Sequence, residues 1–360
     1  MALHFRLPLQ QLKYWIGVSL LFSGIACSFN PINAFSLQKP PKVIVPATAS
    51  LPGQQMWKMG ASSFLFGTND TYEWSKQNIQ TDSTIQSALR LAGFTLMRSF
   101  FPDKASDAVV EQRIRTIENS GARCLGVITN IADAAFNEHL VRYLGKRCLM
   151  YEFGNESDYN NITLDEYLAQ WNNQIPNLRR ENPQAVFIGP VTHDDQGNDD
   201  FMRGFLEGVK ASHILPNAVS FHWYPCDHDT QQSCLDKADS YQQVTQNAYR
   251  LVHDILGKVL PVGITEWNYD PSNPPPSYGD NQAFMTTFST RALASMVRGG
   301  VAFACQFDAA SYSGYGRLDM FNVNSEHPKP QYYAIKSVIA QYRPLSMAKV
   351  TPTPLVSGTR

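Results

Sequence analysis

Eight short apolar segments rich in β-branched and aromatic residues recur along the chain, and stretches with helical periodicity separate them. The segments cover residues 62–67, 95–101, 123–129, 148–154, 185–191, 218–224, 260–266 and 301–307. Strands that alternate with helices pair in parallel, because the chain returns along a helix between one strand and the next. Eight such units favour closure of the sheet, so the sequence predicts an α/β fold built as a single (β/α)8 TIM barrel.

The helical stretches carry their own start and stop signals. Thr163 and Glu166 form a capping box in front of an apolar stripe, and Asn182-Pro183 ends that helix. Apolar residues at helical spacing also precede Gly121 and Gly257, which are typical helix ends. An open doubly wound sheet is the main alternative. Its glycine-rich phosphate turn is absent, because the first strand candidate, FLFGTND, lacks the G-x-G-x-x-G spacing.

A length of 360 residues suits one barrel with extensions, since a (β/α)8 barrel needs roughly 250 residues. We expect residues 57–345 to form the barrel, residues 35–56 a linker or N-terminal arm, and residues 346–360 a disordered tail. The formal net charge of −1 argues against a nucleic-acid partner, because such proteins carry a basic surplus. No zinc or calcium ligand spacing appears, so we expect no metal or other cofactor.

Residues 1–34 have the pattern of a signal peptide. Arg6 and Lys13 precede an uncharged apolar run that is too short to span a bilayer, for which about 20 residues are needed. Cleavage after Ala34 would release the chain, whereas cleavage just before Cys27 would leave a lipid anchor, and the sequence allows both. We therefore expect a secreted, periplasmic or cell-surface protein that is monomeric.

The cysteines fit an oxidising compartment. Cys226 and Cys234 flank a polar loop, where a disulfide bond is expected. Cys124 and Cys148 open two neighbouring strand candidates, and the sequence is compatible there with either a second disulfide or two buried thiols.

Two strand candidates end in acidic motifs, YEFGNES at residues 151–157 and VGITEWN at residues 262–268. Side chains at the carboxyl ends of barrel strands face the ligand-binding mouth. Glu156 ends the fourth candidate and Glu266 the seventh, so both carboxyl groups are expected at one mouth. Such a pair can hydrolyse a glycosidic bond with retention, because one acid protonates the leaving group and one carboxylate attacks the sugar.

These motifs resemble those of clan A, the large group of retaining glycosidases with catalytic glutamates on barrel strands four and seven, which includes xylosidase, arabinofuranosidase and heparanase-like families. The stretch 153–156 is similar to the Asn-Glu signature of the fourth strand, and 264–268 to the nucleophile strand. The resemblance covers roughly residues 62–344. It implies a glycoside hydrolase acting on a carbohydrate, with Glu156 as general acid/base, Glu266 as nucleophile, and Asn155 on the hydroxyl next to the anomeric carbon.

The resemblance also implies three supporting residues. Arg98, at the end of the second strand candidate, matches an arginine that the clan places near the nucleophile. It would keep Glu266 ionised while Glu156 stays protonated. His222 and Tyr224 match a His-x-Tyr pattern at the end of the sixth strand. Tyr224 would donate to Glu266, and His222 would border the acid/base.

Glu152 and several aromatic residues are further candidates. Side chains alternate between the two faces of a strand, so Glu152, four residues before Glu156, is expected to face the same side. It would then lie below Glu156, paired with Arg98 or a polar neighbour. The aromatic residues near strand ends, which could stack on sugar rings, are Trp267, Tyr269, Tyr159, Phe307 and Tyr312. The clan usually has a tryptophan at the end of strand eight as the platform under the reacting sugar. Here Gln306 or Phe307 takes that place.

Other interpretations accompany this one. The segment Thr192–Asp195 after the fifth strand candidate is expected to be a solvated polar loop rather than a substrate or cation contact. Asn155-Glu156-Ser157 also matches an N-glycosylation sequon. The alternative functions are a non-catalytic carbohydrate-binding barrel and a barrel isomerase or hydrolase in which Glu156, His222 and Glu266 bind a divalent metal.

Overall fold

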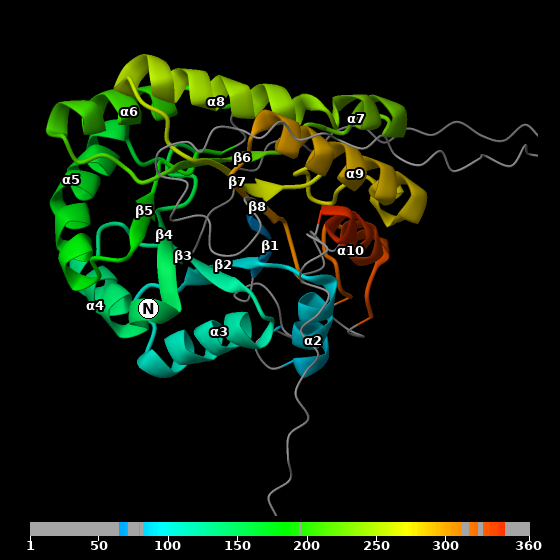
Figure 1. Cartoon of the computed structure of the whole chain (residues 1–360), viewed down its shortest axis with the longest axis horizontal. Helices are drawn as coiled ribbons and strands as arrows, with labels where there is room; N and C mark the ends of the chain where they lie inside the picture. Colours follow the sequence, from blue (N-terminus) through cyan, green and yellow to red (C-terminus); the bar gives the residue numbers. More distant parts are fainter. Residues whose placement is uncertain are drawn as a thin grey trace, which may run out of the picture. The chain divides into compact units, whose positions relative to one another are not determined.

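The computed structural model describes residues 65–70, 79, 82–193, 196–310, 317–322 and 327–342. Outside these residues lie the predictions for the signal peptide, the Cys27 anchor, the linker, Asp194, Asp195, Tyr312 and the C-terminal tail. In the described part, eight parallel strands form one sheet, and helices surround it (Figure 1). The prediction of a (β/α)8 barrel is therefore confirmed.

The strands are β1 (Leu65–Asp70), β2 (Leu96–Phe101), β3 (Arg123–Ile128), β4 (Cys148–Phe153), β5 (Val186–Ile188), β6 (Val219–Trp223), β7 (Val262–Trp267) and β8 (Phe303–Gln306). The helices are α2 (Ser83–Ala92), α3 (Asp107–Asn119), α4 (Ala134–Leu144), α5 (Leu164–Glu181), α6 (Asp200–Ser212), α7 (Gln231–Lys237), α8 (Ser240–Leu256), α9 (Gln282–Gly299) and α10 (Pro330–Tyr342). Short 3₁₀ turns, η2 (Gly145–Arg147) and η3 (Ser277–Asp280), precede β4 and α9.

The sheet closes between β5 and β6. The strands pair in the order β5-β4-β3-β2-β1-β8-β7-β6, which leaves β5 and β6 at its two ends. Parallel bridges from Ile188 to Ala218 and from Thr192 to Phe221 join these ends. The carboxyl ends of all eight strands therefore lie around one mouth.

The inside of the barrel has an apolar layer and a polar layer. The apolar layer consists of Leu65, Leu96, Leu125, Met150, Val186, Ile188, Ala218, Phe303 and Cys305. Inward side chains recur every second residue along a strand, so the next inward positions lie closer to the mouth. On β2, β4 and β6 those positions hold Arg98, Glu152 and Ser220, all buried. The charged residues Arg98 and Glu152 therefore lie next to the apolar layer, on the side of the mouth.

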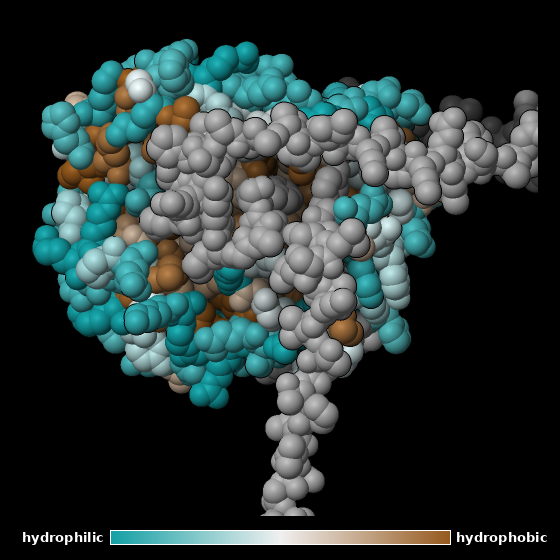
Figure 2. All heavy atoms as spheres, viewed as in Figure 1, coloured by the Kyte–Doolittle hydropathy of each residue, from teal (hydrophilic) through white to brown (hydrophobic). Residues whose placement is uncertain are grey.

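The larger hydrophobic core lies between the strands and the helices. Helix α5 shows how the sequence builds it: Thr163 Oγ1 accepts from the Glu166 amide at 3.2 Å, and the Glu166 carboxylate accepts from the Thr163 amide at 2.9 Å. This confirms the predicted capping box. Trp171 and Ile175 then bury one face of α5. Hydrophilic residues cover the outer faces of helices such as α8 and α3 (Figure 2).

Two strands differ by three residues from a predicted bound, and the others by one or two residues. The first was expected at residues 62–67, but β1 runs to Asp70 because polar residues continue it inside the barrel. Asn69 Nδ2, for example, donates to the carbonyl of Thr265 at 3.0 Å. The fifth was expected at residues 185–191, but β5 ends at Ile188, since Pro190 has no amide proton for the ladder.

Two disulfide bonds tie parts of the barrel together. Cys226–Cys234 closes the loop after β6, as expected. Cys124–Cys148 links β3 to β4, so the second pair, which the sequence left undecided, is a disulfide. Within the described residues, no helix is long and apolar enough to cross a membrane.

Candidate active site

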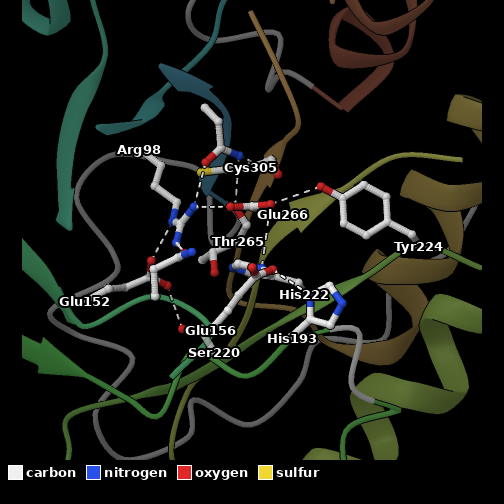
Figure 3. A network of polar contacts seen from close by, with 12 residues as sticks. Arg98, Glu152, Glu156, His193, Ser220, His222, Tyr224, Thr265, Glu266 and Cys305 are labelled. Atoms are coloured by element: carbon white, nitrogen blue, oxygen red, sulfur yellow. Dashed lines mark hydrogen bonds and ion pairs between the residues drawn. The ribbon is translucent and has the colours of Figure 1, made fainter. Parts of the chain in front are cut away.

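Arg98 is the centre of the polar layer (Figure 3). Its buried guanidinium donates from Nε to Glu152 Oε2 at 2.5 Å and from Nη1 to Glu266 Oε1 at 2.7 Å. Further bonds run from Nη1 to Asn69 Oδ1 at 2.8 Å and from Nη2 to Asn155 Oδ1 at 2.5 Å. Burial alone would lower the pKa of Arg98, but the charges of Glu152 and Glu266 raise it above its ordinary value. The arginine therefore stays cationic beside both carboxylates.

Glu266 points into the barrel because β7 is irregular. Ile264 packs outside the barrel, so in a regular strand the side chain two residues later would also point outward. The register of β7 shifts against both neighbouring strands at this point, and the shift turns Glu266 inward, as a β-bulge does. Tyr224 Oη donates to Glu266 Oε2 at 3.0 Å, and Arg98 holds Oε1. Donors on both oxygens fix the carboxylate in one orientation.

Glu156 is presented by a turn that follows β4. Gly154 and Glu156 have φ angles of 89° and 46°, in the left-handed region. The Glu156 amide donates to the Val191 carbonyl at 2.8 Å, and Val191 has a φ of 61°. Left-handed conformations cost free energy in residues other than glycine, and they occur at sites where a side chain must be aimed. This turn, rather than strand parity with Glu152, directs the Glu156 carboxyl group.

Two histidines contact the same oxygen of Glu156. Nδ1 of His222 lies 2.6 Å from Oε1, and Nδ1 of His193 lies 2.8 Å from it. His222, from β6, is fully buried, whereas the His193 side chain, from the loop after β5, is 32% exposed. The prediction of a solvated polar loop at Thr192–Asp195 is therefore wrong for His193. Its role was missed because the path of a loop decides which side chain reaches the mouth, and no sequence pattern encodes that path.

The histidines control the protonation of Glu156. Burial alone would raise the pKa of Glu156, but the charge of His222 and hydrogen bonds from His193 and His222 lower it well below its ordinary value. In the free site Glu156 is therefore ionised. The family resemblance implies a protonated Glu156, and the structure differs because two histidines contact its carboxylate. The motifs point to the arginine near Glu266 but do not reveal the second histidine, His193.

The remaining polar contacts support these groups. Ser220 Oγ donates to Glu152 Oε1 at 2.6 Å, so Glu152 links β6 to Arg98 on β2. Asn155 is held by Arg98 at the edge of the mouth. Burial raises the pKa of Tyr224, and the negative charge of Glu266 raises it further, so Tyr224 remains a hydrogen-bond donor.

Phe307, rather than Gln306, borders the site at the end of β8. The Gln306 side chain is buried away from the mouth, and its Nε2 donates to the Leu318 carbonyl at 2.9 Å. The Phe307 ring contacts the Tyr224 ring edge-on, with 6.4 Å between centroids. Because Tyr224 holds Glu266, Phe307 lies on the Glu266 side of the mouth.

The predictions that Trp267 and Tyr269 stack on sugar rings are wrong. Trp267 is 1% exposed and packs against Phe66 and Tyr241, between the barrel and its helices. Tyr269 is completely buried against Phe284. The irregularity that turns Glu266 inward leaves the next side chain pointing outward, so neither ring can reach the mouth.

The two catalytic candidates lie close together. One carboxylate oxygen of Glu156, one of Glu266 and a ring nitrogen of His222 all lie within 4.8 Å of one another. The carboxyl groups are therefore near enough to act on the same bond, with Arg98 beside one of them and two histidines beside the other.

Comparisons with known proteins give a family match and a shared fold. Residues 140–299 match the family model described as the glycosyl hydrolase catalytic core. No curated protein matches the sequence.

Several solved structures share the fold. A glucosidase from Croceicoccus marinus aligns over 77% of this chain and 67% of its own, with a TM-score of 0.61 at 18% identity. A monomeric β-xylosidase from Caulobacter crescentus CB15 aligns over 77% and 68%, with a TM-score of 0.62 at 14% identity. Xylanase 10B from Thermotoga maritima aligns over 77% and 94%, with a TM-score of 0.51 at 14% identity. This chain thus spans about two thirds of the glucosidase and xylosidase chains.

The family match covers both Glu156 and Glu266, and the fold is an eight-stranded parallel barrel. The chain is a glycoside hydrolase: it folds as a (β/α)8 barrel, and its residues 140–299 match the glycosyl hydrolase catalytic core.

Proposed function

We propose that the protein is a secreted retaining glycosidase in which Glu266 is the nucleophile and Glu156 the general acid/base. The spacing of their carboxyl groups is the observation that carries this proposal. Retaining enzymes hold the two groups roughly 5–5.5 Å apart, whereas inverting enzymes separate them by about 6.5–9.5 Å to admit a water molecule. Oxygens of Glu156 and Glu266 lie within 4.8 Å of each other, which favours retention.

In the first step, a Glu266 oxygen attacks the anomeric carbon as the bond to the glycosidic oxygen breaks. Arg98 and Tyr224 orient the attacking carboxylate. The leaving oxygen takes a proton from Glu156, whose Oε1 lies in hydrogen-bond contact with His193 and His222. Asn155 lies beside Arg98, where it can bind the neighbouring sugar hydroxyl.

In the second step, Glu156 acts as a base. It removes a proton from a water molecule, whose oxygen bonds to the anomeric carbon and releases Glu266. The two histidine contacts favour the ionised form that this step needs. Phe307, on the Glu266 side of the mouth, is placed to support the reacting sugar.

Secretion is part of the same proposal. Both disulfides would persist in an oxidising compartment and would be reduced in a cytosol. The N-terminal pattern of basic residues followed by a short apolar run agrees with export.

Replacement of Glu266 with glutamine tests the assignment. Glutamine keeps the shape but cannot form the covalent bond, so turnover of aryl glycosides is expected to fall at least ~10³-fold. Glu207→Gln, an exposed glutamate on α6, is the matched control and should keep full activity. A 2-deoxy-2-fluoroglycoside should add its sugar mass to the wild type at Glu266 and leave Glu266→Gln unlabelled.

The product's anomeric configuration is an independent test. Proton NMR of a fresh reaction should show the same configuration in product and substrate, and an inverted product would exclude the double displacement. A chelator should leave activity unchanged. Loss of activity with a chelator would favour the metal alternative, for which Glu156, His222 and Glu266 are grouped closely enough.

A further inference from the structure

Tyr159 is an exposed aromatic residue beside the acid/base. It lies in the turn after β4, and the residue is 66% exposed. Its amide donates to the carbonyl of Glu156 at 3.0 Å, so the two residues belong to one turn. Most exposed apolar residues need no explanation, but an aromatic ring next to catalytic groups is available to a ligand.

His193 holds the Tyr159 ring in place. The two rings pack against each other in a tilted arrangement, with 4.5 Å between centroids and 33° between planes. His193 is itself fixed, because Nδ1 contacts Glu156 and its amide donates to Asp158 Oδ2 at 3.0 Å. Since one face of Tyr159 packs against His193, its exposed area belongs mainly to the other face and the hydroxyl edge.

The ring lies on the side of the leaving group. In a retaining glycosidase the acid/base protonates the glycosidic oxygen, so groups beyond it contact the departing part of the substrate. Tyr159 is connected to Glu156 through His193 and through the shared turn. Phe307 and Tyr224 lie on the Glu266 side instead. The mouth therefore has an aromatic residue on each side of the bond to be cleaved.

We propose that Tyr159, supported by His193, is the platform of a leaving-group subsite, and that the leaving group it binds is a sugar ring. This inference rests on the proposed function, because it takes Glu156 to be the acid/base. A sugar presents C–H groups on one face, which pack on an aromatic face, whereas a small alcohol has too little area to do so. The natural substrate is then an oligo- or polysaccharide rather than a simple alkyl glycoside.

The experiment compares two substrates that share the same reacting sugar. One is a glycosyl fluoride, whose leaving group is a single atom, and the other is a disaccharide. Tyr159→Ala is expected to lower kcat/KM for the disaccharide about tenfold, which corresponds to about 1.4 kcal/mol, and to leave the fluoride rate unchanged. Tyr159→Phe should retain most of the disaccharide activity. Tyr143→Ala, at an exposed tyrosine on α4, is the control and should affect neither substrate.

Equal losses on both substrates would overturn the subsite and show that Tyr159 merely supports Glu156. Unchanged rates on both would also overturn it. Titration of the disaccharide into Glu266→Gln, with and without Tyr159→Ala, tests the subsite separately from turnover, and equal affinities would exclude it. If the wild type cleaves neither substrate, the proposed function fails, whereas this binding comparison still decides the subsite.

Discussion

A single arginine side chain organises the charges of this site. Arg98 bonds to Glu152, Glu266, Asn155 and Asn69, which come from β4, β7, the turn after β4, and β1. A lysine could not replace it, because an ammonium is a compact charge and lacks the planar fork that reaches several acceptors at once. The positions of Glu266, the proposed nucleophile, and of Asn155, the residue before Glu156, therefore depend on Arg98 as well as on the barrel itself.

The histidines beside Glu156 give a pH dependence that can be measured. With a glycosyl fluoride the first step needs no proton, so where the second step limits kcat, the fall of kcat in acid reports protonation of the base Glu156. His193→Ala removes a bond that lowers the pKa of Glu156, while burial, which raises it, remains. The acid limb of kcat should therefore move to higher pH in this variant.

The exposed His139 supplies the control, and His139→Ala should leave the profile unchanged. An acid limb that stays in place in His193→Ala would mean that His222 alone sets the charge of Glu156. A change in KM without a change in the profile would point to a purely steric role of His193.

At the scale of elements, the sequence predicted the barrel well and the orientation of individual side chains less well. Eight apolar segments and the capping box at Thr163 were sufficient for the architecture, because hydrophobic periodicity is a local property. The strand irregularity at Glu266 and the turn at Glu156 depend on neighbouring strands and loops. For that reason Glu156, Glu266 and Arg98 could be named from motifs, whereas Trp267 was misplaced and His193 was missed.

A salt-bridge cluster on the outer helices should add stability in a limited pH range. Glu111 on α3 binds Arg147 and Arg115, each at 2.6 Å, and these bonds lower the pKa of Glu111 to about 2 from an ordinary value of 4.5. A carboxylate with a lowered pKa stabilises the fold above its unfolded pKa and loses that contribution as the pH falls through its folded pKa. The contribution should be full above pH 4.5 and disappear between 4.5 and about 2.

Glu111→Gln is therefore expected to lower the free energy of unfolding at pH 7 by at most about 1 kcal/mol, because the pair is at the surface. Urea unfolding of this variant and the wild type should give converging stabilities as the pH approaches 2. Glu207→Gln, at an exposed glutamate on α6, is the matched control. A difference that persists at pH 2 would indicate lost packing rather than lost charge.

At the scale of the whole molecule, the disulfides constrain the unfolded chain unequally. Cys124–Cys148 spans 24 residues and Cys226–Cys234 spans 8, and the loop-closure model gives about 3.5 and about 2.5 kcal/mol for loops of these sizes. Cys124→Ala/Cys148→Ala should therefore lower Tm more than Cys226→Ala/Cys234→Ala. Calorimetric scans of both variants measure the order, and a reversed order would show that native-state packing outweighs chain entropy.

The hydrogen bond between the Glu156 amide and the Val191 carbonyl joins two residues that are both held in left-handed conformations. Each such conformation costs on the order of 1–3 kcal/mol and persists only while its surroundings impose it. The loops after β4 and β5 therefore form one inseparable unit for protein engineering. A chimaera that exchanges only one of them would let the other relax and turn Glu156, the proposed acid/base, away, so changes of specificity made by loop grafting should transfer both loops together.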